Sequence, residues 1–468
     1  MGISDEDCVT AARLILTSYA LDNLDTIGRH ILQFIDSGDK PDGKAIDDFF
    51  TPGFFESEFF LVWSTLMGPL REHSAVEFVR YFERFLRVLP SVDTMTDVWR
   101  MPLNQHDAVA VPIAKELVRR GVRFKFNAVV EDIAFDKVGD GIRAASIEIR
   151  APTGSATTAH AGRPAVSVPI GENDFVFVTL GSQLANLSVG SMDEPPKPVS
   201  RPEDAWALWA RIAKNARDLG RHDFGDPEVF FKPNEPLSTW VTFTVTATDR
   251  RFLDLLEAKS KVKPLRQGLV SVIDSPWLIT VAPFRKPHFV GQPKGVWTWW
   301  GFSLCHDKKG DFDQPGEFVR RKITHCSGSQ ILEETTEQLG FGSDKTHILE
   351  SSACIPCLLP HAGSVWMKRK DADRPKVIPD GARNFAFLGP FCEMPKDTMF
   401  TMEYSVRSAW TAVEGLFKLD GFKPPAVYQG LEDKRAIDAV FERFVVKQAV
   451  EDVLKTPLFE AIRRQICR

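Results

Sequence analysis

The sequence predicts an α/β protein in which a doubly wound domain is interrupted by an inserted α+β region. A helix over Pro112–Gly121 runs into an alternating strand over Val122–Phe126. After a hairpin, the apolar stretch Asp174–Ser182 is typical of a strand buried on both faces of a parallel sheet. A second such strand, Asn384–Gly389, comes much later and precedes a helix over Glu403–Leu419. The chain between the two strands mixes helical and strand patterns.

Composition excludes several classes of protein. The 468 residues carry a net charge of -5 and are 43% hydrophobic, which fits a soluble globular protein and not a disordered or nucleic-acid-binding one. Seven cysteines make no disulfide framework, and the first residues show no basic and apolar leader, so we expect a cytoplasmic, reducing compartment. The 35 Phe and 11 Trp suit an apolar cavity, or equally a core with a Phe bias.

The order of elements between residues 112 and 182 resembles the second half of an FAD-binding doubly wound domain. In that reading Val130 offers backbone to the adenine, and Gly181 lets the main chain approach the cofactor. The helix after the return strand would point its N-terminus at the flavin or its pyrophosphate. Each piece alone also fits a generic α/β sheet, but their order favours FAD. The sequence has no G-x-G-x-x-G turn, so we expect weak FAD binding or none.

A helix in the first hundred residues begins at a capping box formed by Ser74 and Glu77 and ends at Pro90. Its apolar residues fall on one buried face. Its polar face is expected in solvent, with Arg80, Glu83, Arg84 and Arg87.

These patterns divide the chain into five regions. Residues 1–100 are helical and cover the substrate site, and 101–190 are the second half of an incomplete FAD-binding domain. Residues 191–380 form the inserted substrate domain, 381–420 the return strand and helix, and 421–468 the C-terminal helices. The tail from Asp433 is basic and amphipathic, so we expect peripheral membrane contact, or equally packing on its own domain or a dimer partner.

Two short motifs could carry chemistry. The pair Cys354-Ile-Pro-Cys357 is predicted to be structural, since it is the only such pair and His361 nearby does not complete a zinc set. We therefore predict no metal. The stretch Phe284-Arg-Lys-Pro-His288 gathers potential cations that suit a carboxylate ligand, although a solvated loop explains them as well.

Longer stretches make the chain resemble the oleate hydratases, the FAD-binding fatty acid hydratases also called myosin-cross-reactive antigens. The likeness is continuous from about Ile46 to Leu419, through DDFFTPGFFESEFFLVWSTLM, HSAVEFVRYFERFL, MPLNQHDAVAVPIAKEL, FRKPHFVGQPKG, DRPKVIP and NFAFLGPFCEMPKDTMFTMEYSVRSA. The resemblance implies addition of water to the cis double bond of an unsaturated fatty acid, with FAD in a structural or electrostatic role. It places Arg285 and His288 at the substrate carboxylate. The cofactor residues implied by the resemblance and by the fold pattern are Val130, Gly181, Ser182, Phe391, Thr401, Glu403 and Ser405.

The chain departs from the family at positions that matter for catalysis. The family tyrosine lies in Tyr-Asn-Gln-Tyr, whereas this sequence has Leu103-Asn-Gln-His106, and leucine donates no proton. The nearest polar substitutes are Asn104 and His106. The family carboxylate motif Thr-x-Asn-Arg-Gln-Pro-His loses two polar contacts here, and the family's N-terminal dinucleotide-binding segment and its glutamate have no counterpart. The alternative to a hydratase is therefore an inactive or repurposed lipid-binding relative.

Overall fold

The computed structural model describes residues 41–85, 87–88, 98, 100–150, 165–200, 205–231, 235–260, 268–419, 421–430, 433 and 435. The expected helices in the first forty residues and in the C-terminal tail lie outside these ranges. Within them no helix is long and apolar enough to cross a membrane.

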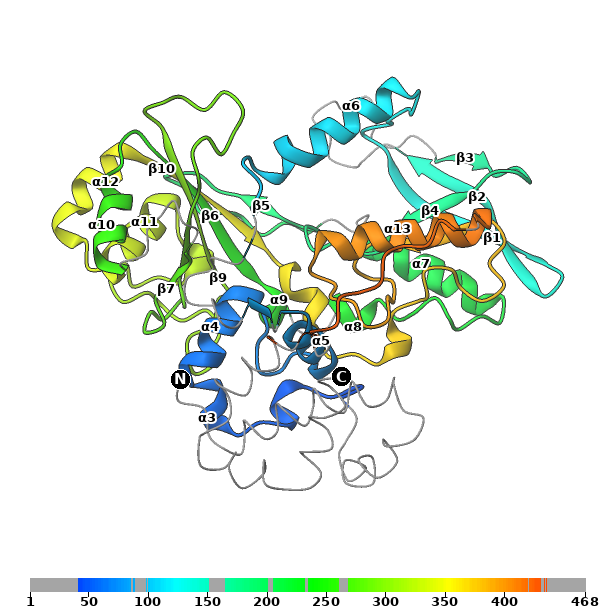
Figure 1. The fold of residues 1–468 in the computed structure, drawn as a ribbon, viewed down its shortest axis with the longest axis horizontal. Helices are drawn as coiled ribbons and strands as arrows, with labels where there is room; N and C mark the ends of the chain where they lie inside the picture. Colours follow the sequence, from blue (N-terminus) through cyan, green and yellow to red (C-terminus); the bar gives the residue numbers. More distant parts are fainter. Residues whose placement is uncertain are drawn as a thin grey trace.

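The largest sheet is antiparallel and has six strands in the order β5-β10-β6-β9-β8-β7. Their bounds are Ser188–Val189, Ser352–Leu359, Trp240–Ala247, Trp297–Ser303, Thr280–Pro283 and Val270–Ser271. Helices α10 (Arg251–Ser260), α11 (Gly328–Gln338) and α12 (Lys345–Ser351) lie together at one end of the molecule, beside this sheet (Figure 1). A core of aliphatic and aromatic residues joins helices and sheet, including Val241, Phe243, Phe252, Trp299, Ile331 and Leu332.

The second half of the fold holds a short parallel pair, β4 (Val176–Thr179) and β11 (Phe385–Leu388). An antiparallel sheet of β1 (Val129–Val138), β2 (Gly141–Arg150) and β3 (Val166–Pro169) lies beside it. Helix α7 (Ala205–Asp218) packs on β1, and α13 (Met402–Phe417) packs on β11. The predicted hairpin, return strand and final helix are therefore confirmed.

The helices that precede this half are built around phenylalanine. They comprise η1 (Ile46–Asp48), α3 (Pro52–Phe55), α4 (Glu58–Met67) and α5 (Ala75–Phe85). The Ser57 hydroxyl accepts from the Phe60 N–H at 3.2 Å and caps α4. The packed rings include Phe50 and Phe54, whose centroids are 4.0 Å apart. The Phe bias of the sequence thus builds a core here.

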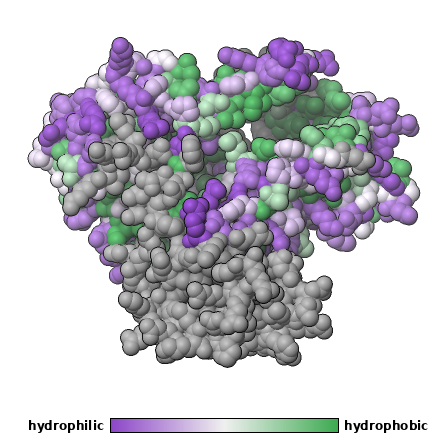
Figure 2. Space-filling view, viewed as in Figure 1, coloured by the Kyte–Doolittle hydropathy of each residue, from purple (hydrophilic) through white to green (hydrophobic). Residues whose placement is uncertain are grey.

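The remaining described helices are short. They are the π-helical turn His106–Ala110, which continues into α6 (Val111–Arg119), then α8 (Glu228–Phe231), α9 (Glu235–Ser238), and 3-10 turns at Ile323–His325, Gly342–Asp344, Ala362–Trp366 and Asp371–Asp373. Helix α6 has no buried residue. Apolar side chains gather around a hollow beside it (Figure 2).

Helix α5 differs from the prediction in two ways. The capping box is not formed, because the Ser74 N–H donates to the Trp366 carbonyl at 2.8 Å and the Glu77 carboxylate is paired elsewhere. Most of its polar face is also not solvated, since Glu83 is 7% exposed and the Arg80 side chain 14%, whereas Arg87, just beyond the helix, is exposed as predicted. The reason is that this face packs against charged loops distant in the sequence, and not against water.

Two strand expectations also need correction, and one strand was not predicted. Residues 122–126 form no strand and are exposed, and no strand of the described chain pairs with them. Strand β4 is not buried on both faces, because Phe175 and Phe177 are 36% and 38% exposed. Strand β3, which pairs with β2, was not predicted, and residues 151–164 before it lie outside the described residues.

Candidate functional site

The segment that carries Leu103 packs directly onto the loop that carries Arg285 and His288. The backbone N–H and the side-chain amide of Asn104 both donate to the His288 carbonyl, each at 2.9 Å. The Asp107 carboxylate accepts from the Val290 N–H at 3.0 Å and from the Asn104 amide at 2.9 Å. The two motifs that the sequence singled out for catalysis and for carboxylate binding therefore form one structural unit.

The loop itself is closed by local contacts. The rings of Phe284 and His288 stack with centroids 3.7 Å apart. The Gln292 side-chain oxygen accepts from the His288 N–H at 2.5 Å. Burial lowers the pKa of His288, and the nearby Asp107 only partly opposes this. At neutral pH His288 is therefore a neutral hydrogen-bonding group and not a third cation.

Two guanidinium groups lie near each other at this unit. The pKa of Arg100 is lowered by burial and further by the positive charge of Arg285. Arg285 is exposed and Arg100 is half-buried. Since like charges repel, an anion placed between them would be stabilised by both. Sequence reasoning missed Arg100, whose signal was its place three residues before Leu103.

The substitutes for the family tyrosine differ in what they can do. Leu103 is half-buried, and Asn104 is fully engaged in the hydrogen bonds above. The His106 side chain is 76% exposed, with its Nδ1 3.3 Å from the Asp107 carboxylate. Of the three positions, only His106 has a titratable group.

The proposed flavin residues on α13 lie at the start of that helix. The Thr401 hydroxyl accepts from the Tyr404 N–H at 3.2 Å and caps the helix. The Glu403 carboxylate pairs with both Arg84 and Arg407. Ser405 lies one residue beyond Tyr404 and is half-buried. The helix is placed by Ser408, whose hydroxyl accepts from the Gly389 N–H at 3.0 Å, at the end of β11.

Gly181 and Phe391 both pack within the protein's own core. A Cβ at Gly181, whose φ is +59°, would lie 2.8 Å from the Phe391 ring and 2.9 Å from Trp206. Phe391 is 0% exposed and packs on Trp206 at 4.6 Å. The close approach that demands glycine here is that of two aromatic side chains.

The other two predicted cofactor residues have open surroundings. Ser182 is half-buried, and its hydroxyl accepts from the Leu184 N–H at 3.2 Å. Val130 lies on β1 and is half-buried at the edge of the core. These two positions are partly accessible, whereas Gly181 and Phe391 are buried.

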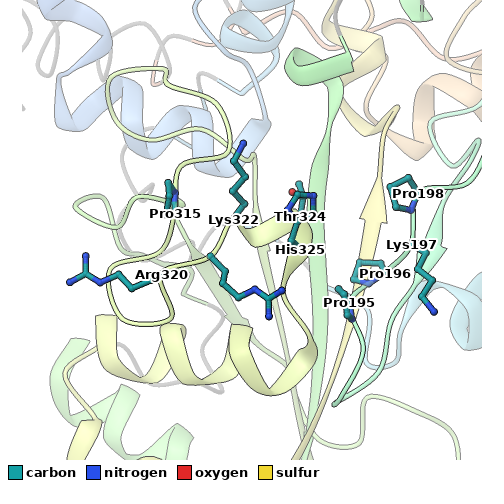
Figure 3. A pocket seen from close by; sticks show the side chains of 10 residues that line it. Pro195, Pro196, Lys197, Pro198, Pro315, Arg320, Lys322, Thr324 and His325 are labelled. Atoms are coloured by element: carbon teal, nitrogen blue, oxygen red, sulfur yellow. The ribbon is translucent and has the colours of Figure 1, made fainter.

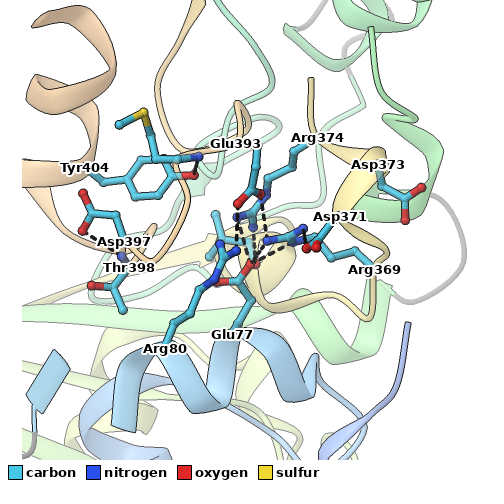
Figure 4. A network of polar contacts seen from close by, with 12 residues as sticks. Glu77, Arg80, Arg369, Asp371, Asp373, Arg374, Glu393, Asp397, Thr398 and Tyr404 are labelled. Carbon is cyan, nitrogen blue, oxygen red and sulfur yellow. Dashed lines mark hydrogen bonds and ion pairs between the residues drawn. The ribbon is translucent and has the colours of Figure 1, made fainter. Parts of the chain in front are cut away.

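A buried ion network joins α5 to the loops that carry Arg369, Arg374 and Glu393 (Figure 4). Glu77 and Arg369, both with fully buried side chains, are 2.6 Å apart, and Arg374 lies 2.9 Å from the same carboxylate oxygen. Burial alone would raise the pKa of Glu77, but the positive charges of Arg374, Arg369 and Arg80 outweigh it and lower the pKa to about 2. Arg80 continues the network to Glu393 at 2.8 Å.

The two halves of the molecule meet through aromatic rings. Phe400, just before α13, lies 5.8 Å from Trp240 on β6, and Trp240 lies 6.1 Å from Phe302 on β9. The ring centroid of Trp300 lies 4.7 Å from that of Phe302. Trp300 also pairs with Ala282 on β8, the strand that leads into the Arg285 loop. An apolar wall therefore connects the proposed flavin end to the carboxylate end.

The cysteine pair lies within β10. Cys354 and Cys357 are three residues apart, so their side chains leave opposite faces of the strand, with Cys354 buried and Cys357 half-buried. Burial raises the pKa of both thiols. Among the described residues no group of three or more His, Cys, Asp or Glu side chains could hold a metal ion.

Comparison with known proteins decides the family. A sequence model of the MCRA family matches residues 25–413. The chain belongs to the MCRA family. The predicted resemblance to the oleate hydratases is thereby confirmed.

Two curated relatives of this MCRA protein are similar over most of its length. An oleate hydratase of Streptococcus pyogenes serotype M49 (strain NZ131) is 32% identical over 420 residues, which cover 88% of this chain and 67% of that protein. A linoleate hydratase of Lactiplantibacillus plantarum is 26% identical over 399 residues, covering 79% of this chain and 65% of that protein. The MCRA chain spans about two thirds of the length of these relatives.

Proposed function

We propose that this MCRA protein binds a long-chain unsaturated fatty acid, with the substrate carboxylate held between Arg285, Arg100 and His288. The observation that carries the proposal is the contact of Asn104 and Asp107 with the backbone of His288 and Val290. It fixes the carboxylate loop against the segment that the family uses for chemistry. Two arginines and a neutral imidazole supply charge-assisted and ordinary hydrogen bonds to one anion.

The proposed reaction is the addition of water to the cis double bond of that fatty acid. One group must protonate an alkene carbon while another activates water, both within an apolar site. The apolar wall of aromatic rings from Phe400 to Trp300 would supply the apolar surroundings of this site. His106, beside Asp107, is the available acid in the Leu103 segment.

We propose FAD as a cofactor with a structural or electrostatic role. The chemistry of Ser182, Thr401 and Ser405 fits a polar cofactor at the start of α13, and Val130 leaves space for one. Gly181 and Phe391 do not fit, since each is filled by core packing. Glu403, held between Arg84 and Arg407, would present a fixed negative charge at that end.

A second candidate function is fatty acid binding without hydration. It is favoured by Leu103, which has no proton to give, and by the 76% exposure of the His106 side chain, which places its titratable group largely in water. In that case the carboxylate site would be retained and the acid lost.

The two candidates separate in one experiment. The purified chain is incubated with FAD and oleate, and 10-hydroxystearate is sought by mass spectrometry, beside the Leu103→Tyr variant. Because each positioned acid or base contributes roughly 10²- to 10⁴-fold, the hydratase proposal predicts slow product formation by the unmodified chain, in which His106 replaces the tyrosine, and the binding proposal predicts none. Clear product that is lost in His106→Ala would establish the hydratase with His106 as its acid. Oleate binding without product in any variant would establish fatty acid binding without hydration.

A further inference from the structure

A pocket of about 540 Å³ lies beside α11, in the half of the molecule built on the six-stranded sheet (Figure 3). Its charged lining residues are all of one sign: Lys197, Arg320, Arg321 and Lys322. His325 and Thr324 add polar groups, and prolines form the rest of the wall. Figure 3 shows Pro195 and Pro196 on one side, Thr324 and His325 between the walls, and Arg320 at the outer edge.

The loop that carries the arginines is held rigidly. The buried carboxylate of Glu334 on α11 accepts backbone N–H bonds from residues 317, 318 and 319, at 2.7 to 2.9 Å. The Gly316 N–H also donates to the Arg321 carbonyl at 2.8 Å, which closes the loop. Because these bonds use the backbone, the Arg320 and Arg321 side chains are left for the pocket. Glu334, in turn, has its charge satisfied within the loop.

The proline wall is anchored on the same helix. The N–H groups of Gly328 and Ser329, at the start of α11, donate to the carbonyls of Ser191 and Met192 at 2.8 and 3.0 Å. Prolines at 195, 196 and 198 restrict the backbone that follows. A second pocket, of about 690 Å³, continues on the other side of this wall and is lined by Ser188. That serine is 8% exposed, and its hydroxyl has no hydrogen-bond partner in the described chain.

We propose that the 540 Å³ pocket binds a phosphate group, carried by a soluble phosphoester or by an anionic phospholipid headgroup. Two walls fixed on one helix hold the backbone that carries the cations, which lowers the entropic cost of binding. Two of these cations have a carboxylate partner: Lys197 pairs with the exposed Glu194 at 3.2 Å, and Lys322 lies 4.0 Å from the carboxylate of Asp313. No Phe, Tyr or Trp side chain lines the pocket, which favours recognition of the phosphate itself over stacking of a base. This site does not depend on the proposed fatty acid function.

The test uses the full chain and the double variant Lys197→Glu/Arg321→Glu, with one change on each wall. The matched control is Lys214→Glu/Lys376→Glu, which makes the same charge change at exposed sites elsewhere. Binding of inorganic pyrophosphate is measured by calorimetry, and binding to phosphatidylcholine vesicles with phosphatidylglycerol by sedimentation. Circular dichroism confirms that each variant is folded.

We expect the pocket variant to lose at least tenfold in affinity for one of the two probes, while the control retains the wild-type affinity. Loss for pyrophosphate identifies a soluble phosphoester, and loss for vesicles alone identifies a lipid headgroup. Equal binding by the two double variants, or no binding of either probe by the wild type, would overturn the proposal.

Discussion

Asn104 and His288 are joined by two hydrogen bonds to one carbonyl oxygen, each 2.9 Å long. Replacing Asn104 with alanine removes the side-chain bond and the bond to Asp107. We expect a loss of about 1 to 2 kcal/mol in unfolding free energy and weaker oleate binding, because the carboxylate loop is no longer held in place. Urea unfolding and oleate titration measure the two effects. Gln105→Ala is the matched control, since Gln105 is exposed, and an equal effect of both changes would refute the role of Asn104.

Glu77→Gln tests the buried network. The substitution keeps the shape of the side chain but leaves Arg369 and Arg374 without their buried counter-charge. Removal of one partner of a buried pair costs about 3 to 5 kcal/mol. The same change at the exposed Glu116 on α6 should cost much less, because water screens an exposed ion pair. Similar unfolding midpoints for the two variants in urea would contradict this account of α5.

His73 predicts a pH dependence of stability. Burial lowers its pKa to about 3, from an ordinary value near 6.5. The unfolded chain therefore takes up a proton first as the pH falls, so the stabilising contribution is complete above about 6.5 and is lost progressively toward 3. Between pH 6.5 and 4.5 the stabilising contribution of the Glu77 carboxylate is still present and changes little, since it is lost only as the pH falls from about 4.5 toward 2.

The comparison variant is His73→Gln, whose amide can replace the hydrogen bonds to Leu70 and Leu237. We expect its unfolding free energy to change less between pH 6.5 and 4.5 than that of the wild type. The exposed His222 provides the control variant, His222→Gln. If the unfolding free energy of His73→Gln changes with pH as much as that of the wild type, another group is responsible for the pH dependence.

The cysteine pair is predicted to have no redox role. The double variant Cys354→Ala/Cys357→Ala should retain oleate binding, and the thiols of Cys354 and Cys357 should both remain free in the wild type after exposure to air. Cys354→Ser should lower the unfolding free energy by about 1 to 3 kcal/mol more than Cys357→Ser does, because the new hydroxyl at 354 would be buried in an apolar site. Formation of an intramolecular disulfide, seen by mass spectrometry, would contradict the placement of the two side chains on opposite faces.

Elements with strong local periodicity were predictable from the sequence. The hairpin at Gly141, the return strand β11 and helix α13 each carry their pattern within a few turns or one strand. The predictions that failed concern residues whose contacts lie far away in the sequence. The polar face of α5 looked solvated because Arg369 and Glu393, which neutralise it, come much later in the chain.

The candidate site was partly predictable for the same reason. Arg285, His288 and the Leu103 segment stood out as motifs, but nothing local indicated that Asn104 and Asp107 would bind the loop backbone. Arg100 belongs to the site only because the fold brings it to Arg285. The roles assigned to the cofactor residues stay predictions.

Oleate affinity in Arg285→Gln tests the central claim most directly. The dissociation constant is measured by calorimetry for the wild type, for Arg285→Gln and for Lys294→Gln, an exposed neighbour on the same loop, with oleyl alcohol as a ligand that lacks the carboxylate. Loss of one charge-assisted contact is worth about 1.5 to 3 kcal/mol. We therefore predict at least tenfold weaker oleate binding in Arg285→Gln only, with oleyl alcohol unaffected. Unchanged oleate binding in Arg285→Gln, or equal losses for both ligands, would contradict the carboxylate site.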